Sequence, residues 1–293
     1  MAIPSPSPEN HWQQDLDWWH WLGPPLRPHA EDLRFIQQWI RDPLNQWVQG
    51  KGTETHQDAE NTPLQIGLLG VTPELAILDW PEQSCLTAID SSEKMINAVW
   101  VGDRPHRKVI RGDWRSLPFE PQSCHAILGD GCLTLLDYPQ GYQAIFQELA
   151  RVLHPQGLIS LRCFVRPEIP ESVDSIFADL WTSKIETFHG FKLRLAMALQ
   201  QNLAKGVAMV EVWNCWQQSI ADPTALFETL HWPQALESTI AMYQNSTARY
   251  TFPTRLELQQ IMANAGFQEK AVCIPTYDLG DRCPTLILQL RQS

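Results

Sequence analysis

The sequence predicts an α/β fold built on a doubly wound, mostly parallel sheet, and three observations lead to it. Short apolar runs alternate with helical segments between about residues 64 and 165. Two more apolar runs follow near the C-terminus, at 267–275 and 284–290. The stretch between these parts, about 167–250, lacks strand signals and has a helical composition. Alternation of strands and helices is typical of βαβ units, in which helices connect buried parallel strands.

The expected elements follow one another in a regular order. Five apolar runs predict the first strands, at 64–70, 85–90, 108–113, 124–130 and 157–165. Helical segments lie between or after them, at 73–78, 92–101, 140–153 and 253–265. With the two C-terminal runs, the sequence predicts a sheet of seven strands.

The remaining segments differ from the sheet in composition. Residues 1–10 are rich in proline and predict a mobile tail. Residues 11–63 predict an N-terminal helical arm, which ends in a polar, glycine-bearing linker at 50–63. Residues 64–293 form the expected α/β domain, with a helical insertion at about 167–250.

The arm is unusually rich in tryptophan. Apolar residues recur at helical spacing over Ala30–Val48, and Pro43 is expected to kink or end that helix. The tryptophans can be core residues or can line a pocket, as can Trp213 and Trp216 of the insertion. We expect core for most of them, with the arm also acting as a partial lid over a ligand. The arm tryptophans are Trp12, Trp18, Trp19, Trp21, Trp39 and Trp47.

Composition excludes several classes of protein. The formal net charge is −11 and no run of Lys and Arg occurs, so nucleic acid is not an expected partner. No apolar stretch is long enough to span a membrane, and the N-terminus lacks the pattern of a secretory signal. The seven cysteines are scattered without a C-x-x-C pair, which predicts no zinc site and no disulfide framework. We expect a cytoplasmic protein; its oligomeric state stays open.

Polar loops follow the expected strands where ligands bind in open α/β sheets. The first strand ends at Gly70, and Thr72 is a good helix N-cap. Asp90 closes the second strand, twenty residues after Gly70, the spacing at which an acid meets a ribose diol. Asp113 and Asp130 follow the third and fourth strands. Turns collect Gly and Asp for purely structural reasons, but four such loops in register favour a binding site.

Five segments share one pattern of strands and loops: LQIGLLGVTPELA, LTAIDSSEKMI, VIRGDWRSLPFEPQSCHAILGDG, YQAIFQELARVLHPQGLISLRCF and the later YTFPTRLELQQIMANAGF. Together they resemble the class I S-adenosylmethionine-dependent methyltransferases. The resemblance implies a Rossmann-like sheet, S-adenosylmethionine as cofactor and methyl transfer to a small or medium-sized acceptor. It implies that Asp90 holds the ribose and that Asp113 and Trp114 flank the adenine. The full set of implied cofactor contacts is Gly70, Val71, Thr72, Asp90, Met95, Asp113, Trp114 and Asp130.

The first motif departs from the family pattern of an acid followed by G-x-G-x-G. Pro73 stands where the last glycine is usual, and the leading acid is missing. An NAD(P)-dependent oxidoreductase would have a similar sheet and ribose acid. The sequence lacks the G-x-G-x-x-G motif that this alternative requires, and Glu74 in the first helical turn would repel a diphosphate. A non-catalytic cofactor-binding module is the other alternative.

Methyl transfer requires alignment of the acceptor, and a base only where the acceptor loses a proton. Asp130 is a candidate to orient or deprotonate the acceptor, or it is a turn residue. His20 and His189 are candidate bases or packed residues. Lys192 and Arg194 are candidates for binding a carboxylate-bearing acceptor, or they lie on a solvated helix face.

Overall fold

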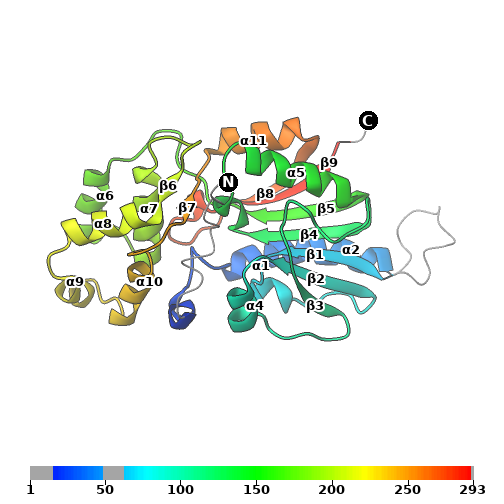
Figure 1. The fold of residues 1–293 in the computed structure, drawn as a ribbon, viewed down its shortest axis with the longest axis horizontal. Coiled ribbons are helices and arrows are strands. Elements are labelled where there is room, and N and C mark those ends of the chain that lie inside the picture. Colours follow the sequence, from blue (N-terminus) through cyan, green and yellow to red (C-terminus); the bar gives the residue numbers. More distant parts are fainter. Residues whose placement is uncertain (1–15, 49–62, 292–293) are drawn as a thin grey trace, which may run out of the picture.

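A computed structural model of the protein describes residues 16–48 and 63–291. The expected tail 1–10 and nearly all of the linker 50–63 lie outside the described residues, as does Trp12. Figure 1 shows a central sheet with helices on both faces and a separate group of helices beside the sheet.

The sheet has the seven strands that the sequence predicts. Its spatial order is β3-β2-β1-β4-β5-β9-β8. Neighbouring strands from β3 to β5 are parallel, whereas β9 is antiparallel to both of its neighbours, β5 and β8. Strand order reverses between β1 and β4, so the crevice used by ligands in such sheets lies there. The strands are β1 Leu64–Leu69, β2 Ser84–Asp90, β3 Arg107–Arg111, β4 Cys124–Asp130, β5 Leu153–Arg162, β8 Phe267–Cys273 and β9 Thr285–Leu290.

The helices fall into those that cover the sheet and those of the insertion. Those beside the sheet are α1 Ala30–Ile36, α2 Asp42–Val48, α3 Pro73–Ala76, α4 Glu93–Val99, α5 Gln140–Val152 and α11 Arg255–Asn264. Those of the insertion are α6 Val173–Trp181, α7 Phe188–Leu199, α8 Met209–Ser219, α9 Pro223–Thr229 and α10 Ser238–Ala241. Shorter turns of helix are η2 Leu16–Trp21, η3 Gln37–Arg41, η4 Cys132–Leu135, η5 Gln234–Glu237 and η6 Gly280–Arg282.

Both faces of the sheet are buried, because each is covered by an apolar helix face. Helices α5 and α11 pack on one face, and α1 and α2 pack on the other (Figure 1). Ile127 of β4 lies against the first group and Leu128 against the second, and both are fully buried. Burial on both sides explains why the strands appear in the sequence as continuous apolar runs.

Of the two effects expected of Pro43, a kink or an end of the arm helix, the structure excludes the end. The chain widens into a π-helical turn over η3, where Asp42 donates its backbone N–H to the Gln37 carbonyl, and α2 continues through Pro43. Ile40 and Leu44 are 1% and 3% exposed and pack against the sheet. The described part of this helical segment is therefore core rather than lid.

The insertion has a core of its own, rich in aromatic rings. Phe188 of α7 contacts the rings of Phe191, Trp216 and Phe227. Trp18 of the arm belongs to the same buried cluster. The insertion also contains a two-stranded pair, β6 Val207–Ala208 and β7 Arg249–Tyr250, which the sequence did not predict because two residues are too short for a strand pattern.

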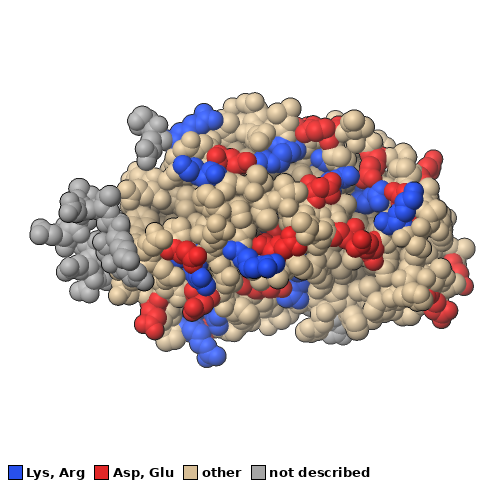
Figure 2. All heavy atoms as spheres, turned by 180° about the vertical axis from the view of Figure 1, so that it is seen from behind, with Lys and Arg blue, Asp and Glu red and all other residues tan. Residues whose placement is uncertain are grey.

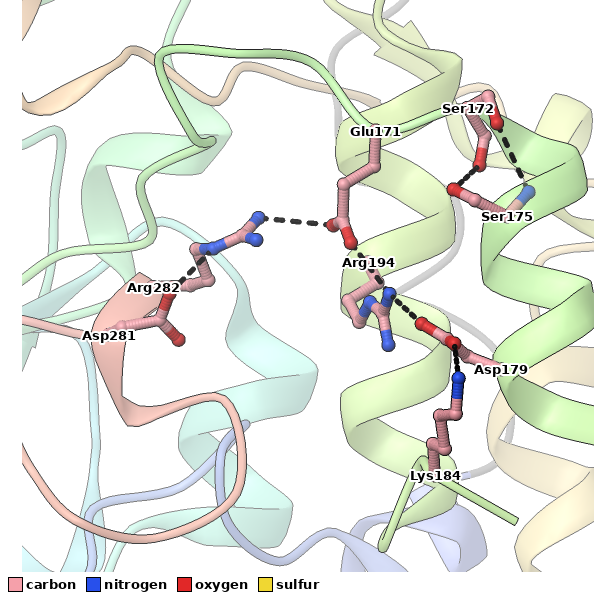
Figure 3. Close-up of polar contacts among 8 residues, drawn as sticks. All are labelled: Glu171, Ser172, Ser175, Asp179, Lys184, Arg194, Asp281 and Arg282. Carbon is pink, nitrogen blue, oxygen red and sulfur yellow. Dashed lines mark hydrogen bonds and ion pairs between the residues drawn. The ribbon is translucent and has the colours of Figure 1, made fainter. Parts of the chain in front are cut away.

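A chain of ion pairs fastens the insertion to the sheet (Figure 3). Glu171 lies between two guanidinium groups, Nη2 of Arg194 on α7 at 2.6 Å and Nη1 of Arg282 in η6 at 3.3 Å. Arg194 also contacts Asp179 of α6 at 2.8 Å. Because η6 lies between β8 and β9, the network ties α6 and α7 to that edge of the sheet.

The surface carries charges of both signs. On the face shown in Figure 2, Lys and Arg alternate with Asp and Glu rather than gathering into one basic patch. Among residues 16–48 and 63–291, no helix combines the length and the apolar character needed to cross a membrane.

Candidate functional site

Gly70 lies at the carboxyl end of β1, beside two of the other expected site residues. Its backbone N–H donates to the Ile89 carbonyl at 2.7 Å, and its φ is +96°. A Cβ built on Gly70 would have Oδ2 of Asp90 and Cζ2 of Trp114 as its nearest neighbours, both at 3.9 Å. The glycine therefore leaves an opening onto the Asp90 carboxylate and the Trp114 ring, where a ligand can approach the backbone.

The two carboxylate oxygens of Asp90 have different surroundings. Oδ1 accepts a hydrogen bond from the Ser92 backbone N–H at 2.8 Å, and the Ser92 hydroxyl caps α4 by accepting from the Met95 N–H. Oδ2 faces Gly70 and accepts no hydrogen bond from the described residues. Burial raises the pKa of Asp90 to about 6. One oxygen thus holds the loop, and the other is available to a ligand hydroxyl.

Trp114 and Asp113, the pair after β3, point to different partners. The Trp114 indole N–H donates to the Ile89 carbonyl at 2.7 Å, which fixes the ring beside Gly70. Asp113 is half-exposed and forms an ion pair with Arg115 at 2.6 Å. The hydrogen bonds from Arg115 lower the pKa of Asp113.

An apolar surface lies between α3 and α4. Val71 and Met95 are buried together with Val99, and Trp19 of the arm packs against them. Thr72 is the N-cap of α3 but forms no side-chain capping bond, and Pro73 occupies the first turn as the sequence suggests. Gly70, Asp90 and Trp114 thus lie together, and Val71 and Met95 form an apolar cluster between α3 and α4. The role of these residues in cofactor binding stays a prediction.

Asp130 is neither a free base nor an ordinary turn residue. The register of β4 and β5 places it beside Arg162, whose Nε donates to Asp130 Oδ1 at 2.6 Å. Burial raises the Asp130 pKa, and the Arg162 charge opposes that shift. Sequence reasoning missed Arg162, although it is the charged residue in the apolar run GLISLRCFV, and a charge there requires a partner.

Residues 22–29 of the arm contact the carboxyl ends of the strands. The Pro25 carbonyl accepts a hydrogen bond from Arg162 Nη1 at 2.7 Å. Arg27 forms an ion pair with Glu74 at 2.6 Å. Glu74, whose charge is expected from sequence to repel a diphosphate, thus lies beside the guanidinium of Arg27. The segment 22–29 lies over the carboxyl ends of the strands, whereas 30–48 is packed on the sheet.

The two candidate histidine bases have opposite surroundings. His20 is exposed on η2. His189 is 5% exposed, and its Nε2 lies 2.8 Å from the Trp21 carbonyl, so this nitrogen carries the proton. Burial lowers the His189 pKa to about 3, which makes it a weak base. His189 is thus a packed residue.

Lys192 and Arg194 do not lie on a solvated face, contrary to that expectation. Lys192 is 2% exposed, and its Nζ donates to the Thr239 carbonyl at 2.8 Å. Arg194 binds Glu171 and Asp179 within the network of Figure 3. In the described part of the chain, no three His, Cys, Asp or Glu side chains are grouped as a metal site requires.

The tryptophans are mostly packed. Trp18 and Trp216 are 5% and 0% exposed and belong to the core of the insertion. Trp213 packs against that core, and Trp39 and Trp47 pack against the sheet. These tryptophans are therefore core residues, as expected from the sequence.

Solved structures resemble the chain in fold at low sequence identity. A Rhodobacter sphaeroides protein assigned to the Zn-dependent alcohol dehydrogenases aligns over 90% of this chain and 98% of its own, with 10% identity and a TM-score of 0.51. A Listeria monocytogenes S-adenosylmethionine-dependent methyltransferase aligns over 90% and 99%, with 14% identity and a TM-score of 0.47. A Methanosarcina mazei methyltransferase of the same kind aligns over 82% and 100%, with 13% identity and a TM-score of 0.43.

The sequence itself gives the more specific match. No curated protein matches the chain significantly. Residues 69–161 match the family model of the methyltransferase domain. That segment spans the loops that hold Gly70, Asp90, Trp114 and Asp130, and it contains β2, β3 and β4. Residues 69–161 are therefore similar in sequence to a methyltransferase domain.

Proposed function

We propose that this protein binds S-adenosylmethionine and transfers its methyl group to a small or medium-sized acceptor. The observation that carries the proposal is the arrangement of Gly70, Asp90 and Trp114 at the carboxyl ends of β1, β2 and β3, beside the point where strand order reverses. There a carboxylate oxygen without a partner among the described residues faces a glycine with positive φ. An acid at the end of the second strand is suited to a ribose hydroxyl.

The residues present fit the cofactor in size and chemistry. Asp90 Oδ2 would accept a hydrogen bond from a ribose hydroxyl, and the missing side chain of Gly70 leaves space for the sugar. Val71 and Met95 would offer apolar surface to the adenine, and the Asp113 carboxylate would flank the adenine. When bound, the cofactor supplies a methyl group on a positively charged sulfur.

The acceptor belongs on the β4 and β5 side of this site. Asp130 and Arg162 close that side with an ion pair, and Pro25 of the arm lies over Arg162. These groups would form a wall against which an acceptor is aligned. Alignment of the attacking atom with the methyl group is the main requirement of the reaction.

A thermal-shift titration tests the cofactor assignment. S-adenosylhomocysteine at 100 times its dissociation constant should stabilise the fold by about 2.7 kcal/mol. NAD⁺ at the same concentration should leave the melting temperature unchanged, since the loop after β1 has no G-x-G-x-x-G. Stabilisation by NAD⁺ alone would favour the oxidoreductase alternative.

A second measurement separates an enzyme from a non-catalytic binding module. The protein is incubated with methyl-labelled S-adenosylmethionine and the small-molecule fraction of a cell extract. An enzyme transfers the label to a new compound and releases S-adenosylhomocysteine. Tight binding of both cofactor forms without transfer into any fraction would favour the module.

A further inference from the structure

A small cavity lies between the carboxyl ends of β4 and β5 and the insertion. Its volume is about 40 Å³. Thr134 of η4 and Phe164 after β5 line it from the sheet, Leu26 from the arm, and Lys192 and Tyr243 from the insertion. Asp90 ends β2, on the opposite side of β1. The cavity thus occupies the position at which an acceptor would face the cofactor site.

The amine of Lys192 has two hydrogen bonds, both to one residue. Nζ donates to the Thr239 carbonyl at 2.8 Å and to the Thr239 hydroxyl at 2.7 Å. That hydroxyl in turn donates to the Leu236 carbonyl at 2.6 Å, so it can only accept from Lys192. A neutral amine has two N–H groups and one lone pair. If the amine is neutral, Thr239 uses both of its donors, and the third position of the nitrogen is a lone pair.

The surroundings of Lys192 favour the neutral amine. No carboxylate pairs with Nζ within the described residues, and burial lowers the Lys192 pKa well below its usual range. The rings of Phe188 and Tyr243 lie 5.6 and 5.8 Å from Nζ. The attraction of such rings for an ammonium is weaker than the cost of burying a charge without a partner.

The other titratable groups around Lys192 supply no negative charge. His189, on the same helix, stays neutral because burial lowers its pKa to about 3. Tyr243 and Tyr250 line the cavity, and burial raises the pKa of Tyr243 to about 12 and that of Tyr250 well above its usual value. All three groups are uncharged at neutral pH.

We propose that Lys192 accepts the proton of the methyl acceptor, and that the acceptor is an aromatic molecule with one weakly acidic hydroxyl. This inference rests on the proposed function. The O–H bond breaks, its proton goes to Nζ of Lys192 and its electron pair stays on oxygen. That oxygen forms the bond to the methyl carbon, while the cofactor sulfur keeps the electron pair of the bond that breaks.

The arm contributes one wall of this cavity. A volume of 40 Å³ holds about three water molecules, whereas benzene needs a cavity of about 150 Å³. Leu26 is the wall that the arm contributes, between Pro25 bound to Arg162 and Arg27 bound to Glu74. The acceptor enters as Leu26 withdraws, and its apolar body replaces the Leu26 side chain.

The ionisation of Lys192 can be measured without cofactor or acceptor. In protein labelled with ¹³C at lysine Cε, the signal that Lys192→Met removes belongs to Lys192. We expect this signal to show a neutral amine at pH 8. An ammonium that persists to pH 10 would overturn the proposal.

A coloured phenol tests proton transfer within the cavity. The probe is 4-nitrophenol, whose anion is yellow and whose neutral form is not, at a pH one unit below its own pKa. Wild-type protein should bind it mainly as the anion, Lys192→Met should bind it neutral, and Lys184→Met should behave as wild type. Binding in the neutral form by wild type, equal spectra for wild type and Lys192→Met, or no binding would each overturn the proposal.

The affinity for S-adenosylhomocysteine separates this inference from the proposed function. Lys192→Met should bind S-adenosylhomocysteine within about threefold of wild type, since Lys192 lies on the acceptor side. If wild type fails to bind S-adenosylhomocysteine, the proposed function fails. If it binds and the phenol stays neutral, only the role of Lys192 fails.

Discussion

Asp130 and Arg162 form a buried ion pair across the carboxyl ends of β4 and β5, with Arg162 Nε 2.6 Å from Asp130 Oδ1. The side chains are 7% and 1% exposed. Arg162 also holds the arm through the Pro25 carbonyl and contacts the Tyr277 hydroxyl at 3.4 Å. One guanidinium thus joins two strands, the arm and the segment before β9 at the edge of the proposed site.

Removing one member of this pair should destabilise the fold strongly. Asp130→Ala leaves the Arg162 charge buried without its partner, which costs about 3–5 kcal/mol of unfolding free energy. Urea denaturation measures this loss. Asp113→Ala, which breaks the exposed pair with Arg115, is the control and should cost less than about 1 kcal/mol. Equal small losses in both variants would contradict the structural role of Asp130.

Gly70 should affect both stability and cofactor binding, and Gly102 offers a matched control. Both have positive φ, +96° and +86°, so Ala at either position should cost about 1–2 kcal/mol of stability. Only Gly70→Ala places a methyl group between Asp90 and Trp114, so only that variant should lose affinity for S-adenosylhomocysteine, by at least tenfold. Calorimetric titration of both variants checks this. Equal affinities of the Gly70→Ala and Gly102→Ala variants for S-adenosylhomocysteine would show that Gly70 is not part of the binding site.

The pH dependence of cofactor affinity should follow Asp90. Burial raises the Asp90 pKa to about 6 in the free protein, and hydroxyl donors of a bound ribose would favour the charged form and lower it again. Affinity for S-adenosylhomocysteine should therefore fall about tenfold per pH unit below pH 6 and level off above pH 7. Asp90→Asn should bind weakly with no such slope. A pH-independent wild-type affinity between pH 5 and 8 would contradict the ribose role.

Stability should fall on acidification, in part through His125. This ring stacks on His154 with 5.1 Å between ring centroids, and burial lowers its pKa to about 4. The unfolded chain takes up the proton near pH 6.5, so the stabilising contribution is complete above that pH and is lost as pH falls towards 4. Asp90, with its raised pKa, acts in the opposite direction. Comparison of variants therefore isolates the effect of His125.

The measurement is the unfolding free energy from pH 4 to 7. His125→Gln should flatten the decline between pH 6.5 and 4, whereas the same substitution at exposed His20 should leave the curve unchanged. A decline as steep in His125→Gln as in wild type would show that other groups govern the acid sensitivity.

The sheet could be predicted from sequence because its strands are buried on both faces. Runs such as Cys124–Asp130 are mostly apolar and buried, and polar loops end them. The course of the arm could not be predicted in the same way. Pro43 suggests a helix end, but the π-helical turn before it depends on how Ile40 and Leu44 meet the sheet.

The cofactor side was easier to predict than the acceptor side for a physical reason. Gly70, Asp90 and Trp114 end successive parallel strands, so the topology alone brings them together. The pairing of Asp130 with Arg162 depends on register, and the burial of Lys192 depends on how α7 packs against α10. Neither register nor helix packing is specified by local sequence patterns.

The affinity of Asp90→Ala for S-adenosylhomocysteine tests the central claim most directly. Loss of one hydrogen bond to a charged group costs about 1.5–3 kcal/mol, so binding should weaken roughly 10- to 150-fold relative to wild type in calorimetric titration. Ser92→Ala, which removes the α4 cap but keeps the carboxylate, should bind within about threefold of wild type. Micromolar binding by wild type with this loss confined to Asp90→Ala is the predicted result. Wild-type affinity in Asp90→Ala would contradict the account.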